Sequence, residues 1–149
     1  MKRYQIEALA IEGKNKGICR EWAVCNHYMV PRTSHDHTPY DKGSDLDVAD
    51  KHISIKASRF TLMSGRLCEG HEDFDGIWSL YAERVHSNCF IYVTADFVAY
   101  EMNLDEFKKF VYTFGILSRD SKKNGGKVKI AGRPESGKMR KWLAAQAAA

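Results

Sequence analysis

The chain has 149 residues, of which 44% are hydrophobic, and a formal net charge of +4 at pH 7. This length is enough for one domain with its own hydrophobic core, so we expect a single domain over residues 1–149. No apolar run approaches the roughly 20 residues of a membrane helix, and the N-terminus lacks the apolar block of a signal peptide. We therefore expect a cytoplasmic protein with no membrane segment. The mild positive charge permits a nucleic-acid partner without requiring one.

The first part of the chain predicts two helices followed by a polar loop. Residues 2–11 place their apolar side chains at helical spacing, which favours a short helix. In residues 18–30 apolar side chains recur about every four positions, which predicts an amphipathic helix that ends before Pro31. Residues 31–44 are rich in turn formers. The triplet His35-Asp36-His37 within them is interpreted either as a metal-binding group or as a solvated segment.

The next stretch, residues 42–59, predicts two short strands joined by a tight turn. Its apolar residues alternate with polar ones, so that one face carries Leu46, Val48, Ile53 and Ile55 and the other carries Asp45, Asp47, Ser54 and Lys56. A turn with Asp50 and Lys51 at its tip places Asp45 opposite Lys56 and Asp47 opposite Ser54. A register slip of one residue would send the acids to the other face.

The polar face of this hairpin has two interpretations. A solvated edge hairpin is the simpler one. Carboxylates beside a lysine also suit metal-assisted phosphodiester hydrolysis, because carboxylates hold a hard divalent cation and lysine stabilises the attacking water or the charge that develops on the phosphate.

The pattern beyond this hairpin predicts a helix and two strands. An acidic loop comes first, in which Asp73 or Asp75 caps a helix over residues 77–85. Residues 89–93 are a nearly continuous run of apolar strand formers, which is typical of a strand buried on both faces. Residues 97–102 then form a hairpin with that strand.

The last third of the chain predicts two more helices and a basic surface. Asn103 as N-cap and Glu106 at the capping-box position open a helix that ends at Gly115. The C-terminal segment 118–143 is basic: residues 118–141 carry nine Lys or Arg against two acids. We expect it to contain a loop over 118–127, an edge strand over 127–130 and a helix over 139–146. Its charge is either a solvated face or a clamp on phosphates.

Asp45 followed by Ser54-Ile55-Lys56 resembles the motif of the PD-(D/E)xK nuclease superfamily, in which Asp begins one strand and Glu-x-Lys lies on the next. In this chain Ser44 stands in place of the proline and Ser54 in place of the second acid. Some restriction endonucleases of the superfamily carry Ser-x-Lys and recruit an acid from elsewhere. The order of helix, acid-bearing strand, Lys-bearing strand, helix and further strands is also similar, over roughly residues 12 to 115.

The resemblance implies an α/β (α+β) fold with a restriction-endonuclease-like mixed central sheet flanked by helices. In that sheet the 45–48 and 53–57 hairpin lies beside the strand at 89–94. The implied activity is a sequence-specific endonuclease of restriction or homing type, which hydrolyses phosphodiester bonds of double-stranded DNA with Mg²⁺ or Mn²⁺. So small a domain would cut both strands as a homodimer or a higher homo-oligomer.

The resemblance also implies a role for individual residues. Asp45 is a metal ligand, the Ile55 carbonyl completes the metal shell, Lys56 positions or activates water, and Ser54 acts from the second-acid position. The missing carboxylate comes from Glu69 or from Glu21 on the first core helix, with Asp47 in reserve. Expected DNA contacts are Ser58, Arg59, Thr61, Lys122, Lys123, Lys127 and Lys129, because hydroxyls and basic side chains are usual phosphate ligands.

Other functions remain open at this point. Ser54 in the acid position favours a non-catalytic DNA-binding module on a degenerate nuclease fold. An RNA nuclease or RNA-binding protein would use the same charges. A small-molecule enzyme is disfavoured, because the sequence contains no Gly-rich phosphate loop, nucleophile elbow or Rossmann fingerprint. Cys19, Cys25, Cys68 and Cys89 include no CxxC pair, so we interpret them as reduced thiols rather than as disulfides or zinc ligands.

Overall fold

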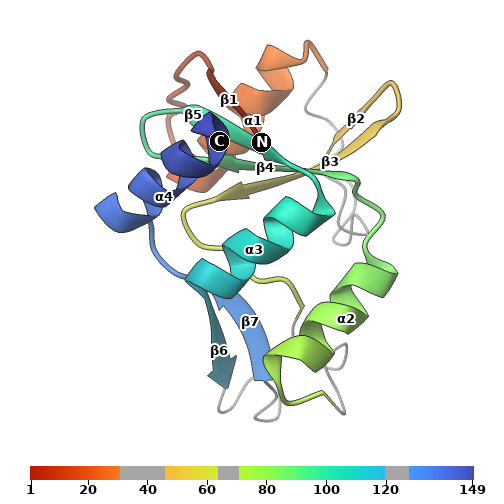
Figure 1. Cartoon of the computed structure of the whole chain (residues 1–149). Coiled ribbons are helices and arrows are strands. Elements are labelled where there is room, and N and C mark those ends of the chain that lie inside the picture. Colours follow the sequence, from red (N-terminus) through yellow and green to blue (C-terminus); the bar gives the residue numbers. More distant parts are fainter. Residues whose placement is uncertain (31–45, 64–70, 120–127) are drawn as a thin grey trace.

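The structure, a computed structural model, describes residues 1–30, 46–63, 71–119 and 128–149. Within them the chain forms a mixed α/β fold with a five-stranded sheet and a separate two-stranded sheet (Figure 1). The strands are β1 (Lys2–Gln5), β2 (Leu46–Val48), β3 (Lys51–Ala57), β4 (Cys89–Val93), β5 (Val98–Met102), β6 (Gly115–Arg119) and β7 (Val128–Gly132). The helices are α1 (Lys16–His27), α2 (Phe74–Arg84), α3 (Leu104–Phe114) and α4 (Gly137–Ala148).

The large sheet has the order β1-β5-β4-β3-β2 and is mixed. β3 and β4 are parallel, whereas the other neighbouring strands are antiparallel. Parallel neighbours need a crossover connection, and the chain between β3 and β4 contains α2. The sequence-based expectation of a mixed sheet with the hairpin beside the strand at 89–94 is therefore confirmed.

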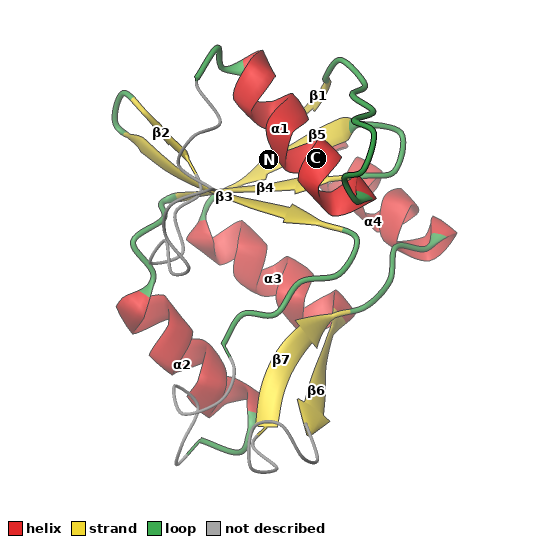
Figure 2. Cartoon of the chain, turned by 180° about the vertical axis from the view of Figure 1, so that it is seen from behind, coloured by secondary structure: helices red, strands yellow, loops and turns green. Residues whose placement is uncertain are grey.

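Helices cover both faces of the large sheet. α1 lies over one face and α3 over the other (Figures 1 and 2). The α1 face encloses a hydrophobic cluster that includes Val24, Ile53 and Ile91, and the α3 face encloses a larger cluster that includes Phe90 and Phe107. All five residues of β4 are buried, as the continuous apolar run predicts.

The helix expected over residues 2–11 is wrong, because residues 2–5 form the edge strand β1. Its register pairs Tyr4 with Ala99 of β5, and the Ile6 N–H continues the ladder by donating to the Phe97 carbonyl at 2.9 Å. The apolar spacing that favours a helix there extends over too few residues to outweigh hydrogen bonding to an available sheet edge. Tertiary pairing of this kind commonly overrides local propensity.

The other predicted helices are confirmed, with the caps that the sequence indicates. Asp73 caps α2, and its side chain accepts a hydrogen bond from the Gly76 N–H at 2.5 Å. Asn103 and Glu106 form a reciprocal capping box at the start of α3, with distances of 2.8 and 3.0 Å. Each satisfies main-chain donors that a helix N-terminus leaves unpaired.

The β2–β3 hairpin forms, but its register differs from the expected one. Leu46 pairs with Ile53 and Asp47 with His52, so the turn contains Ala49 and Asp50 instead of Asp50 and Lys51. Ala49 has a left-handed backbone (φ 53°), which a tight two-residue turn requires. Because the shift is two residues, the alternation of faces is preserved.

The basic C-terminal segment contributes to a small sheet, and residues 120–127 of the predicted loop lie outside the described residues. β6 includes Ser118 and Arg119, which were expected in a loop, and it pairs antiparallel with β7. The chain after β3 runs beside β7 and is hydrogen-bonded to it. The Leu62 N–H donates to the Ile130 carbonyl, and the Gly132 N–H donates to the Phe60 carbonyl.

This junction leaves no space for a side chain at Gly132. A Cβ atom there would lie 2.5 Å from a ring carbon of Phe60, which itself packs on Phe107 and Phe110. We expect Gly132→Ala to destabilise the protein by about 1–3 kcal/mol, the usual cost of overpacking, as measured by urea denaturation. Gly137→Ala is the matched control, because a Cβ there meets nothing within 4 Å and alanine favours the first turn of α4. Equal stability of the two variants would contradict the packing argument.

Candidate functional site

A pocket of about 350 Å³ lies where the first half of α1 meets the later part of β3. It brings together Glu21 and Lys56, the two charged residues that the sequence singled out on the first core helix and on the Lys-bearing strand. Its lining residues are Asn15, Gly17, Ile18, Glu21, Ser54, Ile55, Lys56, Ala57, Arg59 and Phe60. Sequence positions far apart in the chain therefore share one concave surface.

α1 positions Glu21 through its cap and its apolar face. The Asn15 side chain accepts a hydrogen bond from the Ile18 N–H at 2.8 Å, which fixes the start of the helix beside the pocket. Residues Ala23, Val24 and Cys25 are buried against the sheet. Glu21 is half-buried, with its place on the helix set by these neighbours.

β3 positions Ser54 and Lys56 by its alternation. Ile53 and Ile55 belong to the cluster on the α1 face, so strand alternation directs Ser54 and Lys56 to the face away from α1, and Lys56 lines the pocket from the last turn of the pleat before β3 ends at Ala57. Ser54 is 1% exposed, whereas Lys56 is half-buried with its Nζ 5.8 Å from the centre of the Phe60 ring. The aromatic face favours a cation at this position.

The chain leaves the sheet abruptly at Ser58. This residue has a left-handed backbone (φ 46°), which is uncommon for a residue with a side chain. Beyond it Arg59 is exposed and lines the pocket, while Phe60 turns back to pack on Phe107. Arg59 is thereby the second cation beside Lys56 in the pocket lining.

The described lining residues offer only part of the ligand set that a divalent cation needs. Glu21 is the one carboxylate among the described lining residues of the pocket, and Ile55 also lines the pocket. In the described part of the chain no three His, Cys, Asp or Glu residues lie close enough together to hold a metal ion. Mg²⁺ takes hard oxygen ligands, so Glu21 fits it in kind, but a site here needs a further acid. Asp45 and Glu69, the expected acids, lie outside the described residues.

Asp47, the reserve acid, is not in this pocket. The register places it opposite His52, and its Oδ1 lies 2.8 Å from the His52 Nδ1 on an exposed part of the hairpin. The expected pairing of Asp47 with Ser54 is therefore wrong. The turn is formed by Ala49 and Asp50 instead of Asp50 and Lys51, so each pairing partner moves by two residues along the ladder. The sequence did not indicate this shift, because Asp50-Lys51 is not a strongly preferred turn pair.

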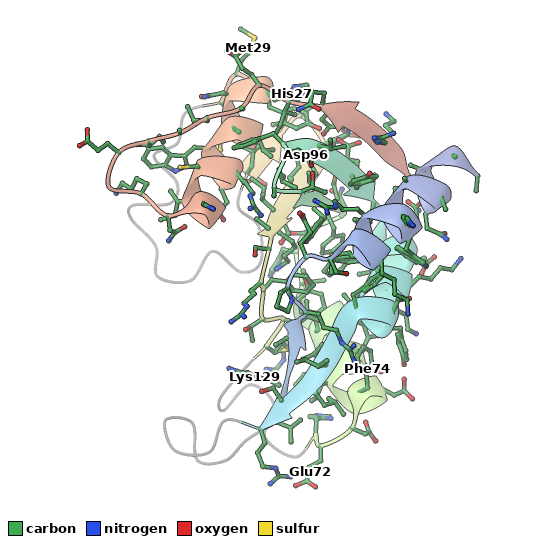
Figure 3. All side chains as sticks on the ribbon, turned by 90° about the vertical axis from the view of Figure 1, so that its left-hand side faces the viewer. His27, Met29, Glu72, Phe74, Asp96 and Lys129 are labelled. Atoms are coloured by element: carbon green, nitrogen blue, oxygen red, sulfur yellow. The ribbon has the colours of Figure 1, made fainter. Side chains whose placement is uncertain are left out.

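The expected DNA contacts are partly described. Ser58 and Arg59 follow β3 directly, and Thr61 forms a bridge with Ala131 of β7. Lys129 lies two residues before Ala131, so its side chain projects from the same face of the small sheet (Figure 3). Lys122, Lys123 and Lys127 lie outside the described residues.

A buried polar cluster around Glu101 was missed by the sequence reasoning. Its carboxylate accepts hydrogen bonds from the hydroxyls of Tyr28 and of Tyr4, the latter at 3.0 Å, and its Oε2 lies 3.5 Å from the Lys51 Nζ. Burial acts to raise the pKa of Glu101, but the tyrosine hydrogen bonds and the nearby lysines outweigh it and hold the pKa below its ordinary value. An acid inside the apolar run 97–102 was the available signal. The cluster ties α1 to β1 and β5.

Burial and the Glu101 carboxylate also affect the Cys89 thiol. Cys89 is buried, and desolvation together with the Glu101 charge raises its pKa to about 11. The thiolate is the nucleophilic form, so a nucleophilic role for Cys89 is disfavoured.

Comparison of the chain with protein-family models, with curated proteins and with solved structures found no match. None of the helices in the described residues has both the length and the apolar character of a membrane span.

Proposed function

We propose that the protein is a Mg²⁺-dependent endonuclease that hydrolyses phosphodiester bonds of double-stranded DNA, on a restriction-endonuclease-like fold. The observation that carries this proposal is the shared pocket of Glu21 from α1 and Lys56 from β3. A mixed sheet with a parallel β3–β4 pair and helices on both faces supports it.

In this proposal the carboxylates of Asp45 and of Glu21 or Glu69, with the Ile55 carbonyl, hold the cation. Bound Mg²⁺ supplies Lewis-acid chemistry at the phosphate. The Lys56 ammonium orients the attacking water and stabilises the negative charge that develops on the phosphate oxygens. Ser54 lines the pocket but is nearly fully buried, so we assign it a supporting role.

The proposed DNA path continues from the pocket onto the small sheet. Arg59 is at the pocket, and Thr61 and Lys129 lie on one face of the sheet that follows it. Segment 118–143 is also basic, so it would add positive charge to a DNA-binding surface. Neutralising phosphates with lysine and arginine releases counterions, so binding along this path weakens with salt. We propose a homodimer as the unit that cuts both strands.

The proposal is tested by incubating the purified protein with supercoiled plasmid and Mg²⁺. We expect conversion to open-circular and linear forms with Mg²⁺ or Mn²⁺, and intact plasmid when EDTA is in excess. Matched DNA and RNA duplexes in parallel reactions identify the substrate class. Cleavage that persists in EDTA would contradict a metal-dependent site, and cleavage of RNA alone would contradict the DNA assignment.

One observation favours a second function, a DNA-binding module without catalysis. The second-acid position holds Ser54, which is 1% exposed and cannot offer a carboxylate to a cation. Salt-sensitive DNA binding without cleavage in any of the metal conditions above would establish this function instead.

A further inference from the structure

A second pocket, of about 320 Å³, lies on another side of the N-terminal end of α1. Its volume is at the lower end of the range of roughly 300–1,000 Å³ that is usual for small-molecule sites. Its lining residues are Leu9, Ala10, Ile11, Lys14, Lys16, Cys19, Arg20, Ala95 and Phe97. Among these described residues three are cations and none is an acid. The proposed nuclease site uses none of them.

Arg20 is the unusual member of this lining. It is 6% exposed, and its Nη1 atom is buried without a hydrogen-bond partner among the described residues. A guanidinium stays protonated in proteins, and leaving one of its buried N–H groups without an acceptor costs free energy. An anion bound in the pocket that Arg20 lines would supply the missing partner.

Two acids lie beside the lining residue Ala95. Glu135 does not line the pocket; its carboxylate accepts hydrogen bonds from the Ala95 N–H at 3.1 and 3.2 Å and lies 3.7 Å from an Arg140 nitrogen. Asp96, between α1 and α4 in Figure 3, accepts a hydrogen bond from the Thr94 hydroxyl. Neither carboxylate lines the pocket, so the charged side chains in its described lining are all cations.

The rest of the lining combines two exposed lysines with an apolar wall. Lys14 and Lys16 are exposed and flank the start of α1, where the helix dipole also favours an anion. Leu9, Ile11 and Phe97 are half-buried and form an apolar wall. Cations next to an apolar wall match a phosphate joined to an aromatic base, because guanidinium pairs with phosphate and a base packs on apolar and aromatic side chains.

We propose that this pocket binds a nucleotide, with its phosphate at Arg20, Lys14 and Lys16 and its base against Leu9, Ile11 and Phe97. The nucleotide is either free in solution or part of a single DNA strand. This inference does not rest on the proposed nuclease activity.

The test is isothermal titration calorimetry of the full chain with AMP, adenosine, inorganic phosphate and a short single-stranded oligonucleotide, all in EDTA. We expect AMP to bind and adenosine to bind at least about tenfold more weakly, since a charged hydrogen bond contributes about 1.5–3 kcal/mol. Inorganic phosphate should compete with AMP. Binding of AMP alone identifies a free nucleotide, and tighter binding of the oligonucleotide identifies a strand.

Variants connect the binding to this pocket. Lys16→Ala and Arg20→Met are each expected to weaken AMP binding about tenfold or more, whereas Lys138→Ala, an exposed lysine of α4 outside the lining, should leave it unchanged. Lys16 is exposed, so its variant reports on binding even if Arg20→Met alters folding. AMP binding that is absent, or that survives Lys16→Ala unchanged, overturns the proposal. Because EDTA excludes metal-dependent cleavage, the result is independent of the nuclease test.

Discussion

Lys56→Ala is expected to lower Mg²⁺-dependent plasmid cleavage by about 10²–10³-fold or more, while DNA binding is retained. Removal of one preorganised group that stabilises transition-state charge typically has an effect of this size. Lys56 is half-buried in the pocket that also contains Glu21, and its Nζ lies over the Phe60 ring. The measurement is the initial rate of plasmid nicking at saturating Mg²⁺, with DNA affinity from fluorescence anisotropy.

One further variant separates the charge of Lys56 from its packing, and two others test the expected metal ligands. Lys56→Met keeps the apolar stem over Phe60 and removes the charge, so we expect it to be as inactive as the alanine variant and nearly as stable as the parent. Glu21→Gln and Asp45→Asn should also lose cleavage if they hold the cation. Glu72→Gln is the control, because Glu72 lies at the far end of the molecule from α1 (Figure 3). If the Lys56→Met variant and the Asp45→Asn variant each cleave plasmid at the full rate, the site is refuted.

Phe107→Ala is expected to destabilise the protein by about 3–5 kcal/mol. Phe107 is 0% exposed and stacks on Phe90 of the central strand, with ring centroids 4.5 Å apart and planes inclined by 3°. It also contacts the rings of Trp78, Tyr81 and Phe110. Truncation therefore removes contacts with several elements at once and leaves a cavity that the surrounding rings cannot fill. The measurement is the free energy of unfolding from urea denaturation.

Lys109→Ala, on the same helix, is the matched control for this variant. Lys109 is exposed, so its truncation should change the free energy of unfolding by no more than about 0.5 kcal/mol. A Phe107→Ala variant as stable as Lys109→Ala would show that the α3 side of the sheet does not depend on this stack.

The elements with strong local signals were predictable from sequence. The capping box at Asn103 and the continuous apolar run at β4 each specify one structure, and both are found. The strand at residues 2–5 was not predictable, because β1 is a short, mostly exposed edge strand stabilised by hydrogen bonds to β5. Nothing in its own residues encodes the presence of that partner. The hairpin register depended on a turn without a preferred residue pair.

The candidate site was predictable in part. The alternation in β3 correctly separated Ser54 and Lys56 from the isoleucines, and the apolar stripe of α1 left Glu21 off its buried face. The burial of Ser54 was not readable, because it depends on the packing of the opposite sheet face against α3. Arg20 was also missed, since a basic residue on an amphipathic helix is normally solvated, and only the fold reveals that this one is buried.

β4 separates the two hydrophobic clusters and belongs to both, since Phe90 and Tyr92 face one and Ile91 and Val93 face the other. Loss of either cluster would expose this strand to water, so the two sides of the sheet must melt as one cooperative unit. β3 pairs with β4 from Ile53 to Ala57. Lys56 therefore lies on a strand that is paired with the centre of the sheet, which is the support that the proposed chemistry at a phosphate would need.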